Sequence, residues 1–277
     1  MPQAPSYRFE RPLWRSGAAR VVGVDEVGVA PTCGAVVAAA VIVRPNTRRI
    51  PGVRDSKTLS AAQRERLAPL IRRQAVAVGV GAASVGEIDR LNIYHATHLA
   101  MRRAIARLGG HDHVLVDGNR IAGFEAHVGP YTAIVDGDAR SYSIACASVV
   151  AKVVRDRMMA RLAARHPGYG WERNQGYATR EHRDAIRRQG LTPFHRRSFL
   201  ALQRTLAGDQ LGLDLFAADR DFDRPPGLNA AGLDVADLVD DPDEACDADA
   251  DAGPGVANPR LIRRAAGHLD EGAAVPR

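Results

Sequence analysis

Residues 21–43, VVGVDEVGVAPTCGAVVAAAVIV, place two acidic residues inside an otherwise apolar passage. The passage predicts two buried strands, Arg20 to Val27 and Ala35 to Val43, joined by a turn rich in glycine and proline. An ionised carboxylate that leaves water costs several kcal/mol unless a cation compensates it. Asp25 and Glu26 therefore need an arginine or a metal ion, unless the strand end simply points these acids into solvent.

Two further predicted strands also end on acidic residues. The run HVLVD at 113–117 finishes at Asp117, and a strand over 132–135 leads into the sequence DGD, which contains Asp136 and Asp138. Acidic residues at the ends of neighbouring strands converge in space, and carboxylate oxygens are the ligands that Mg²⁺ and Mn²⁺ prefer. The three strand ends together predict a divalent-metal site.

The remaining periodicity gives the order of the elements. A capped helix from Ser60 to about Gln74 and a third strand within residues 75–85 follow the first two strands, which predicts an antiparallel meander. A core-facing helix spans Glu87 to Leu108, and a long helix spans Ser143 to about Arg165. Meander, helix, strand, strand and helix is the order of a ribonuclease H-like α/β fold, with a mixed central sheet flanked by helices.

The composition is that of a soluble globular protein, with 45% hydrophobic and 25% charged residues among 277. No apolar run reaches the roughly 18 residues that a membrane span needs, and the N-terminal residues lack the apolar core of a secretory signal. The three cysteines are far apart and lack metal-site spacing. We expect a cytoplasmic protein, and a monomer by default.

The net charge of +6 is unevenly distributed along the chain. Residues 206–277 hold 16 Asp+Glu and 6 Lys+Arg, so residues 1–205 have a net charge of +16. A body this basic favours a polyanionic partner. Nearly all of the positive charge is arginine, and the two lysines, Lys57 and Lys152, indicate places that need a compact ammonium group.

The segment 166–199 is dense in glycine, aromatic and basic residues. Its arginines could form a phosphate track; they are Arg180, Arg183, Arg187, Arg188, Arg196 and Arg197. Its aromatic residues could stack on sugars or bases; they are Tyr169, Trp171 and Tyr177. The alternative is an ordinary solvated arginine helix with aromatic residues in its turns.

Seven motifs stand in order between about residues 18 and 200. They are GVDEVG with its following apolar strand, DSKTLS at 55–60, EIDRLNI at 87–93, LVDGN at 115–119, GDARSYSIACASVVAKVVRD at 137–156, GYATREH at 176–182 and TPFHRRSF at 192–199. In type and order these motifs resemble the signatures of bacterial ribonuclease HII, a type 2 ribonuclease H.

The resemblance implies a metal-dependent endoribonuclease that acts in primer removal and ribonucleotide excision. Such an enzyme hydrolyses the RNA strand of RNA/DNA hybrids and nicks 5′ of ribonucleotides embedded in DNA, leaving 3′-hydroxyl and 5′-phosphate ends. Two Mn²⁺ or Mg²⁺ ions about 4 Å apart would activate water and stabilise the leaving oxygen. The alternative is a non-catalytic or junction-blind homologue that binds RNA/DNA hybrids.

The matched motifs also imply individual residues. The catalytic and metal-binding set is Asp25, Glu26, Asp117 and Asp138. Asp138 is chosen over Asp136 because the family's fourth acid belongs to the GD pair before the long helix. Lys57 and Lys152 are expected near the phosphates, and Tyr177 against the sugar beyond the scissile junction.

The chain departs from the family pattern after the acidic pair, where the family has GRG. Here the turn reads Gly28, Val29 and Ala30, which we name the GVA turn. In the family this turn lets backbone groups approach the ribose and read its 2′-hydroxyl. Ala30 adds a Cβ that needs a negative φ, and Val29 removes an arginine that could contact phosphate. We expect cleavage to survive and recognition of an isolated ribonucleotide to be weakened.

We expect three regions: an N-terminal extension at 1–17, the catalytic domain with its C-terminal helical part at 18–204, and a disordered acidic tail at 205–277. The tail segment QLGLDLF at 210–216 is similar to the QLxLxLF peptide that docks bacterial replication proteins on the sliding clamp. The predicted docking residues are Gln210, Leu211, Leu213, Leu215 and Phe216. The alternative is a terminal amphipathic turn that packs on its own domain.

Overall fold

The computed structural model describes residues 4–207, so the predicted clamp peptide at 210–216 and the acidic residues after it lie outside the described residues. The strands are β1 (Val21–Val27), β2 (Val36–Ile42), β3 (Ala77–Ala83), β4 (His113–Asp117) and β5 (Tyr131–Ile134). The helices are α1 (Glu10–Arg15), the 3₁₀ turn η1 (Ser56–Thr58), α2 (Ala61–Gln74), α3 (Val85–Ala106), α4 (Glu125–Val128), α5 (Gly137–Arg140), α6 (Tyr142–Arg165), α7 (Trp171–Asn174), α8 (Arg180–Gln189) and α9 (Leu200–Ala207).

The strands form one mixed sheet in the order β3-β2-β1-β4-β5. β1, β2 and β3 pair antiparallel, which confirms the predicted meander, and β4 pairs parallel with both β1 and β5. The apolar run of β2 is buried over all seven residues, as expected for a central strand covered on both faces. The predicted ribonuclease H-like arrangement of a mixed sheet flanked by helices is confirmed.

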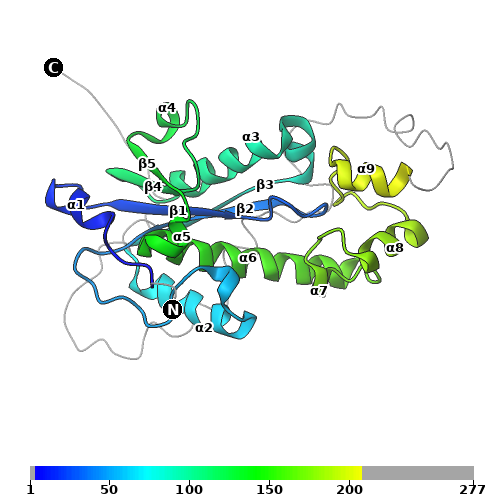
Figure 1. Cartoon of the computed structure of the whole chain (residues 1–277), viewed down its shortest axis with the longest axis horizontal. Coiled ribbons are helices and arrows are strands. Elements are labelled where there is room, and N and C mark those ends of the chain that lie inside the picture. The colour runs from blue at the N-terminus through cyan, green and yellow to red at the C-terminus, as the bar shows by residue number, and fades with distance from the viewer. Residues whose placement is uncertain (1–3, 208–277) are drawn as a thin grey trace, which may run out of the picture. The chain divides into compact units, whose positions relative to one another are not determined.

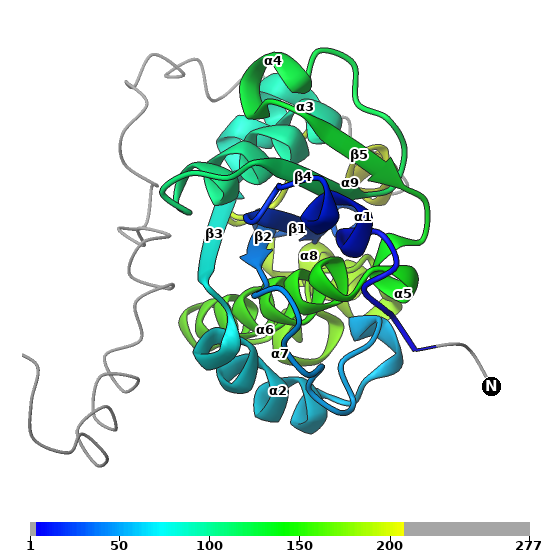
Figure 2. The same cartoon turned by 90° about the vertical axis from the view of Figure 1, so that its left-hand side faces the viewer.

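Helices cover both faces of the sheet (Figures 1 and 2). α3 packs on β3, β2 and β1 from one face, and α6 packs on β1 and β2 from the other, with α2 outside α6. Gly23 of β1 lets α6 approach closely, because a Cβ at this position would lie 2.1 Å from the carbonyl carbon of Ser143. The start of α6 is therefore held against the strand that carries Asp25.

Capping explains where two helices begin. Ser60 caps α2 in a reciprocal capping box with Gln63, as the sequence predicts. Ser84 forms the same box with Glu87 at the start of α3. The predicted start of α3 at Glu87 is two residues late, because Glu87 is the third residue of the capped first turn. Among residues 4–207 no helix is long and apolar enough to cross a membrane.

Within the expected N-terminal extension, the described residues pack on the junction between α5 and α6. Glu10 is fully buried, and its Oε1 accepts hydrogen bonds from Ser141 Oγ (2.7 Å), Ser143 N (2.9 Å) and Ser143 Oγ (2.8 Å). The N–H of Ser6 donates to the Arg140 carbonyl, and the Tyr142 N–H donates to the Ser6 carbonyl. These bonds fix the segment that carries Asp138.

Candidate active site

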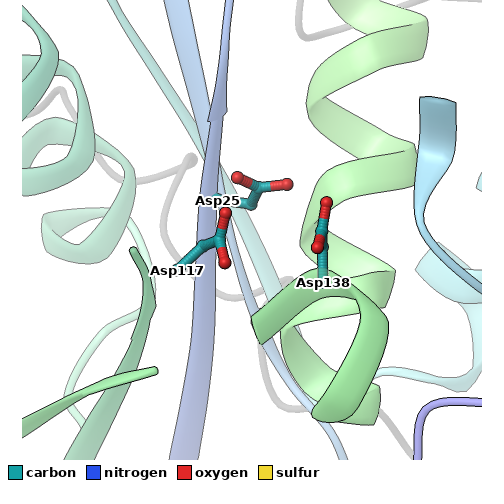
Figure 3. A group of neighbouring side chains, drawn as sticks. All are labelled: Asp25, Asp117 and Asp138. Carbon is teal, nitrogen blue, oxygen red and sulfur yellow. The ribbon is translucent and has the colours of Figure 1, made fainter. Parts of the chain in front are cut away.

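Three buried or half-buried carboxylates meet where β1, β4 and α5 come together. One oxygen from each of Asp25, Asp117 and Asp138 lies within 4.8 Å of the other two. Figure 3 shows the three side chains pointing toward one another. The parallel register pairs Val24 with Val116, so Asp25 and Asp117 occupy the next position on adjacent strands. The structure therefore brings these three carboxylates together, as the strand-end argument expects, and their catalytic role stays a prediction.

The third carboxylate is positioned by the turn after β5. The N–H of Gly137 donates to Asp117 Oδ1 at 2.6 Å, which ties this turn to the end of β4. Asp138 follows within the short helix α5, and its side chain is buried. Asp136 is the preceding cap residue in the left-handed conformation and is exposed, so the structure places Asp138, rather than Asp136, in the carboxylate group.

The pKa values of the cluster indicate that its carboxylates lack a compensating positive charge. Burial raises the pKa of Asp25 well above its ordinary value, and the neighbouring Glu26 and Asp117 raise it further. Burial also raises the pKa of Asp117, and burial together with Asp117 raises the pKa of Asp138. A divalent cation would reverse these shifts by compensating the negative charge. Three convergent carboxylate oxygens are a donor set that fits Mg²⁺ or Mn²⁺.

Glu26 lies beside this group without joining it. It follows Asp25 on β1, and its N–H donates to Asp25 Oδ1 at 2.8 Å. Burial and the nearby Asp117 raise the pKa of Glu26 to about 7. The structure thus brings Glu26 into the field of the three carboxylates, and its role as a metal ligand stays a prediction.

The two lysines have different positions. Lys57 Nζ lies 3.3 Å from Asp138 Oδ2, and its side chain is 77% exposed, so it reaches toward the cluster from the solvent side. Lys152 Nζ instead pairs with Asp156 at 2.5 Å, one turn further along α6. Arg64 binds the same Asp156 carboxylate at 3.2 Å. The structure therefore brings Lys57 to the acids and ties Lys152 into a separate ion-pair network.

Ser148 is a site residue that the sequence motifs did not single out. Its hydroxyl favours the ionised form of Asp25 and so lowers the pKa of that carboxyl. The same hydroxyl donates a hydrogen bond to Ser56 Oγ at 2.9 Å. Ser148 stands four residues before Lys152 and eight before Asp156, so the three share one face of α6. That spacing is the sequence signal from which Ser148 could have been identified.

Arg196 is the main correction to the predicted phosphate track, because its side chain is fully buried. Its Nη2 donates to the Gly28 carbonyl (2.6 Å), its Nη1 to the carbonyls of Val29 (2.9 Å) and Pro31 (2.7 Å), and its Nε to that of Gly34 (2.8 Å). Burial and the neighbouring Arg155 lower the pKa of Arg196 to about 9, so it is charged at neutral pH. The prediction that Arg196 contacts phosphate is wrong.

Arg155 is a second buried guanidinium behind the same turn. It donates to the carbonyls of Ala35 (3.3 Å), Gln175 (3.1 Å) and Cys33 (3.2 Å). Its Nε occupies the space beside Gly28, where a Cβ would lie 2.1 Å from it. Burial raises the pKa of the Cys33 thiol, which disfavours the reactive thiolate form of this cysteine.

The aromatic residues of 166–199 also divide between core and surface. Trp171 and Tyr169 are buried and stack on each other with ring centroids 4.9 Å apart, so their predicted stacking on substrate is wrong. Tyr177 is 49% exposed, as a substrate contact requires. The carbonyl of Tyr177 accepts a hydrogen bond from His182 Nδ1 at 2.9 Å, and His195 Nε2 lies 3.1 Å from His182 Nε2.

The arginines of α8 are partly neutralised by acids on the same helix. Arg180 and Arg187 both pair with Asp184, at 3.7 and 2.8 Å. Because exposed pairs of this kind exchange readily with solvent, these arginines could still meet a polyanion. The α8 segment is therefore closer to the alternative of a solvated arginine helix than to a preformed phosphate track.

Comparison with known proteins supports the resemblance in the motifs. Residues 22–202 match the family model described as Ribonuclease HII. The chain is 57% identical over 194 residues to the ribonuclease HII of Thermosynechococcus vestitus, covering 69% of this chain and 89% of that protein. It is 52% identical over 205 residues to the ribonuclease HII of Ruegeria pomeroyi, covering 73% and 85%.

Solved structures of similar fold include ribonuclease H2 from Pyrococcus horikoshii, with a TM-score of 0.59, 23% identity, and coverage of 68% of this chain and 98% of that one. A second is the PCNA:RNase HII complex from Archaeoglobus fulgidus, with a TM-score of 0.56, 25% identity, and coverage of 65% and 95%. With the matched family model spanning most of the described residues, the chain belongs to the ribonuclease HII family.

Proposed function

We propose that this ribonuclease H hydrolyses the RNA strand of RNA/DNA hybrids and nicks 5′ of ribonucleotides embedded in DNA, leaving 3′-hydroxyl and 5′-phosphate ends. The observation that carries the proposal is the convergence of Asp25, Asp117 and Asp138, whose oxygens lie within 4.8 Å of one another. Their raised pKa values indicate a cluster built to hold positive charge. The relatives named above support the substrate class.

The three aspartates, with Glu26 beside them, would hold two Mn²⁺ or Mg²⁺ ions. When bound, such ions activate the attacking water and stabilise the leaving oxygen. A ribonuclease HIII structure of the same fold, 19% identical and with a TM-score of 0.55, is described as a complex with Mn²⁺. Asp25, the most buried of the three, would be one of the residues that hold these ions.

The surrounding residues bind and orient the substrate. Lys57, exposed at the rim and 3.3 Å from Asp138, supplies a point charge for the scissile phosphate. Lys152 requires exchange of its Asp156 partner before it can contact a phosphate. Tyr177 offers its exposed ring to the sugar beyond the junction. Ala30 does not have a positive φ, so the GVA turn holds its shape without the second glycine of GRG.

The test uses two labelled duplexes, one with a continuous RNA strand and one with a single ribonucleotide in DNA, each with Mn²⁺ or Mg²⁺. We expect metal-dependent cutting of the continuous hybrid, weaker cutting at the single ribonucleotide, and no cutting by Asp25→Asn. Binding without cutting of either duplex would favour the non-catalytic hybrid-binding alternative.

We also propose that residues 210–216 dock on the replication sliding clamp. The support is the sequence QLGLDLF and the Archaeoglobus fulgidus structure, which is described as a PCNA complex of an RNase HII. Leu213, Leu215 and Phe216 would fill apolar pockets, and Gln210 would supply a polar contact. Binding of purified clamp should be lost in Phe216→Ala, and equal binding by both proteins would exclude this peptide.

A further inference from the structure

Arg196 binds the backbone carbonyls of two peptide groups in the GVA turn. The N–H groups of the same two peptides face outward. The carbonyls of Gly28 and Val29 point at the buried guanidinium, at 2.6 and 2.9 Å. In a trans peptide the N–H points opposite to the C=O. The N–H groups of Val29 and Ala30 therefore point away from Arg196, toward the exposed side of the turn.

These two N–H groups are available to a ligand. Neither Val29 N nor Ala30 N donates a hydrogen bond to any residue of the described segment 4–207. The next N–H, that of Thr32, is already used, since it donates to the Gly176 carbonyl at 2.9 Å. Two adjacent outward N–H groups form a donor pair for an oxygen atom. A charged guanidinium on the carbonyl side polarises the peptides and strengthens this pair.

The position of the donor pair suits a sugar next to the scissile bond. Val29 follows Asp25 by four residues, so the chain holds it within about 14 Å of this member of the acidic cluster. The Thr32 to Gly176 bond joins the turn to the residue before Tyr177. The side chain beside the donors is Val29, which is 38% exposed and apolar. A neutral hydroxyl on a ribose fits an apolar rim better than a phosphate does.

Building on the proposed function, we propose that Arg196 is a positioning residue for ribose recognition. By binding the carbonyls of Gly28 and Val29, it orients the N–H groups of Val29 and Ala30 toward the 2′-oxygen of the ribonucleotide at the junction. The arginine of GRG is absent from the surface of this turn, and Arg196 stabilises the turn from beneath. Arg196 touches no reacting atom and acts only through the backbone.

Arg155 supplies a matched control. Both arginines are buried, lie against the GVA turn and donate only to carbonyls. Arg155 packs beside Gly28, but its hydrogen bonds go to the carbonyls of Cys33, Ala35 and Gln175 and to none in the turn. Arg196→Lys and Arg155→Lys each keep a charge and lose the planar fork. Both should lower the unfolding midpoint. Only Arg196→Lys should alter the recognition of ribose.

The measurement is affinity for two duplexes that differ by a single 2′-hydroxyl, in an Asp25→Asn background so that neither is cut. We expect the preference for the ribonucleotide duplex to fall about tenfold in Arg196→Lys, the factor for one hydrogen bond, and to stay within about twofold in Arg155→Lys. Equal weakening on both duplexes would assign the donors to a phosphate and overturn the proposal, as would an unchanged preference.

Two further measurements separate the possible causes of a negative result. If Arg196→Lys does not fold, Ala30→Pro removes one outward donor and leaves the buried arginine in place. Full preference in Ala30→Pro would overturn the proposal. Failure of the proposed function would appear separately, as absence of metal-dependent hybrid cutting by the unmodified protein.

Discussion

Replacing Glu26 with glutamine should stabilise the metal-free protein at alkaline pH. Burial and Asp117 raise the pKa of Glu26 from 4.5 to about 7 in the folded state. This shift corresponds to roughly 3 kcal/mol of destabilisation once the carboxyl is ionised, at 1.36 kcal/mol per pKa unit. Glutamine has nearly the same shape and carries no charge, so it removes this cost.

The sign and the pH range follow from the two pKa values. A carboxyl with a raised folded pKa favours the folded state fully below its unfolded pKa, and this contribution is lost as pH rises through the folded pKa. The advantage of Glu26→Gln should therefore grow between about pH 4.5 and 7 and stay constant above pH 7. At pH 8 it should raise the unfolding midpoint by about 6–12 °C, and at pH 4.5 by about 1–2 °C.

The assay is thermal unfolding followed by circular dichroism, in EDTA, at several pH values. Glu125→Gln is the control, because Glu125 is an exposed carboxylate on α4. It should change the midpoint by less than about 2 °C at every pH. A Glu26→Gln midpoint equal to or below that of the unmodified protein at pH 8, or a gain that does not depend on pH, would refute the electrostatic reasoning.

Four other outcomes are expected. Mn²⁺ should raise the unfolding midpoint of the unmodified protein and not that of Asp25→Asn, measured with and without EDTA; an equal rise would place the ion elsewhere. Glu10→Ala should cost about 3 kcal/mol in urea unfolding, because it leaves buried serine donors unpaired, and a loss under about 1 kcal/mol would contradict the bonding seen. Burial lowers the pKa of His195 to about 3, so the free energy of unfolding should decrease as pH falls from about 6.5 toward 3. His195→Gln should make this decrease smaller, as measured by denaturant titrations at several pH values. Val29→Arg with Ala30→Gly should increase cutting at a single ribonucleotide relative to a continuous hybrid, and an unchanged ratio would show that the turn is not limiting.

The sequence by itself determined the order of the elements and the location of the carboxylate cluster. Both depend on local patterns: alternation and apolar runs predict strands, and acids at the ends of parallel strands must meet because the strands end at the same sheet edge. The pattern does not say which strands are neighbours, and the parallel pairing of β1 with β4 that sets Asp25 beside Asp117 is seen only in the structure. The N-cap at Ser60 is equally local, since the capping box spans three residues.

Only the tertiary structure decided which polar residues are buried and what they bind. In the sequence, Arg196 stands in a basic run and is expected at the surface. In the structure, its guanidinium binds the carbonyls of residues that stand more than 160 positions earlier in the chain. Glu10 likewise binds serines about 130 residues away. Burial is set by such long-range contacts, which leave no periodic signature in the neighbouring residues. A buried guanidinium that binds carbonyls and an exposed one that awaits phosphate therefore look identical in sequence.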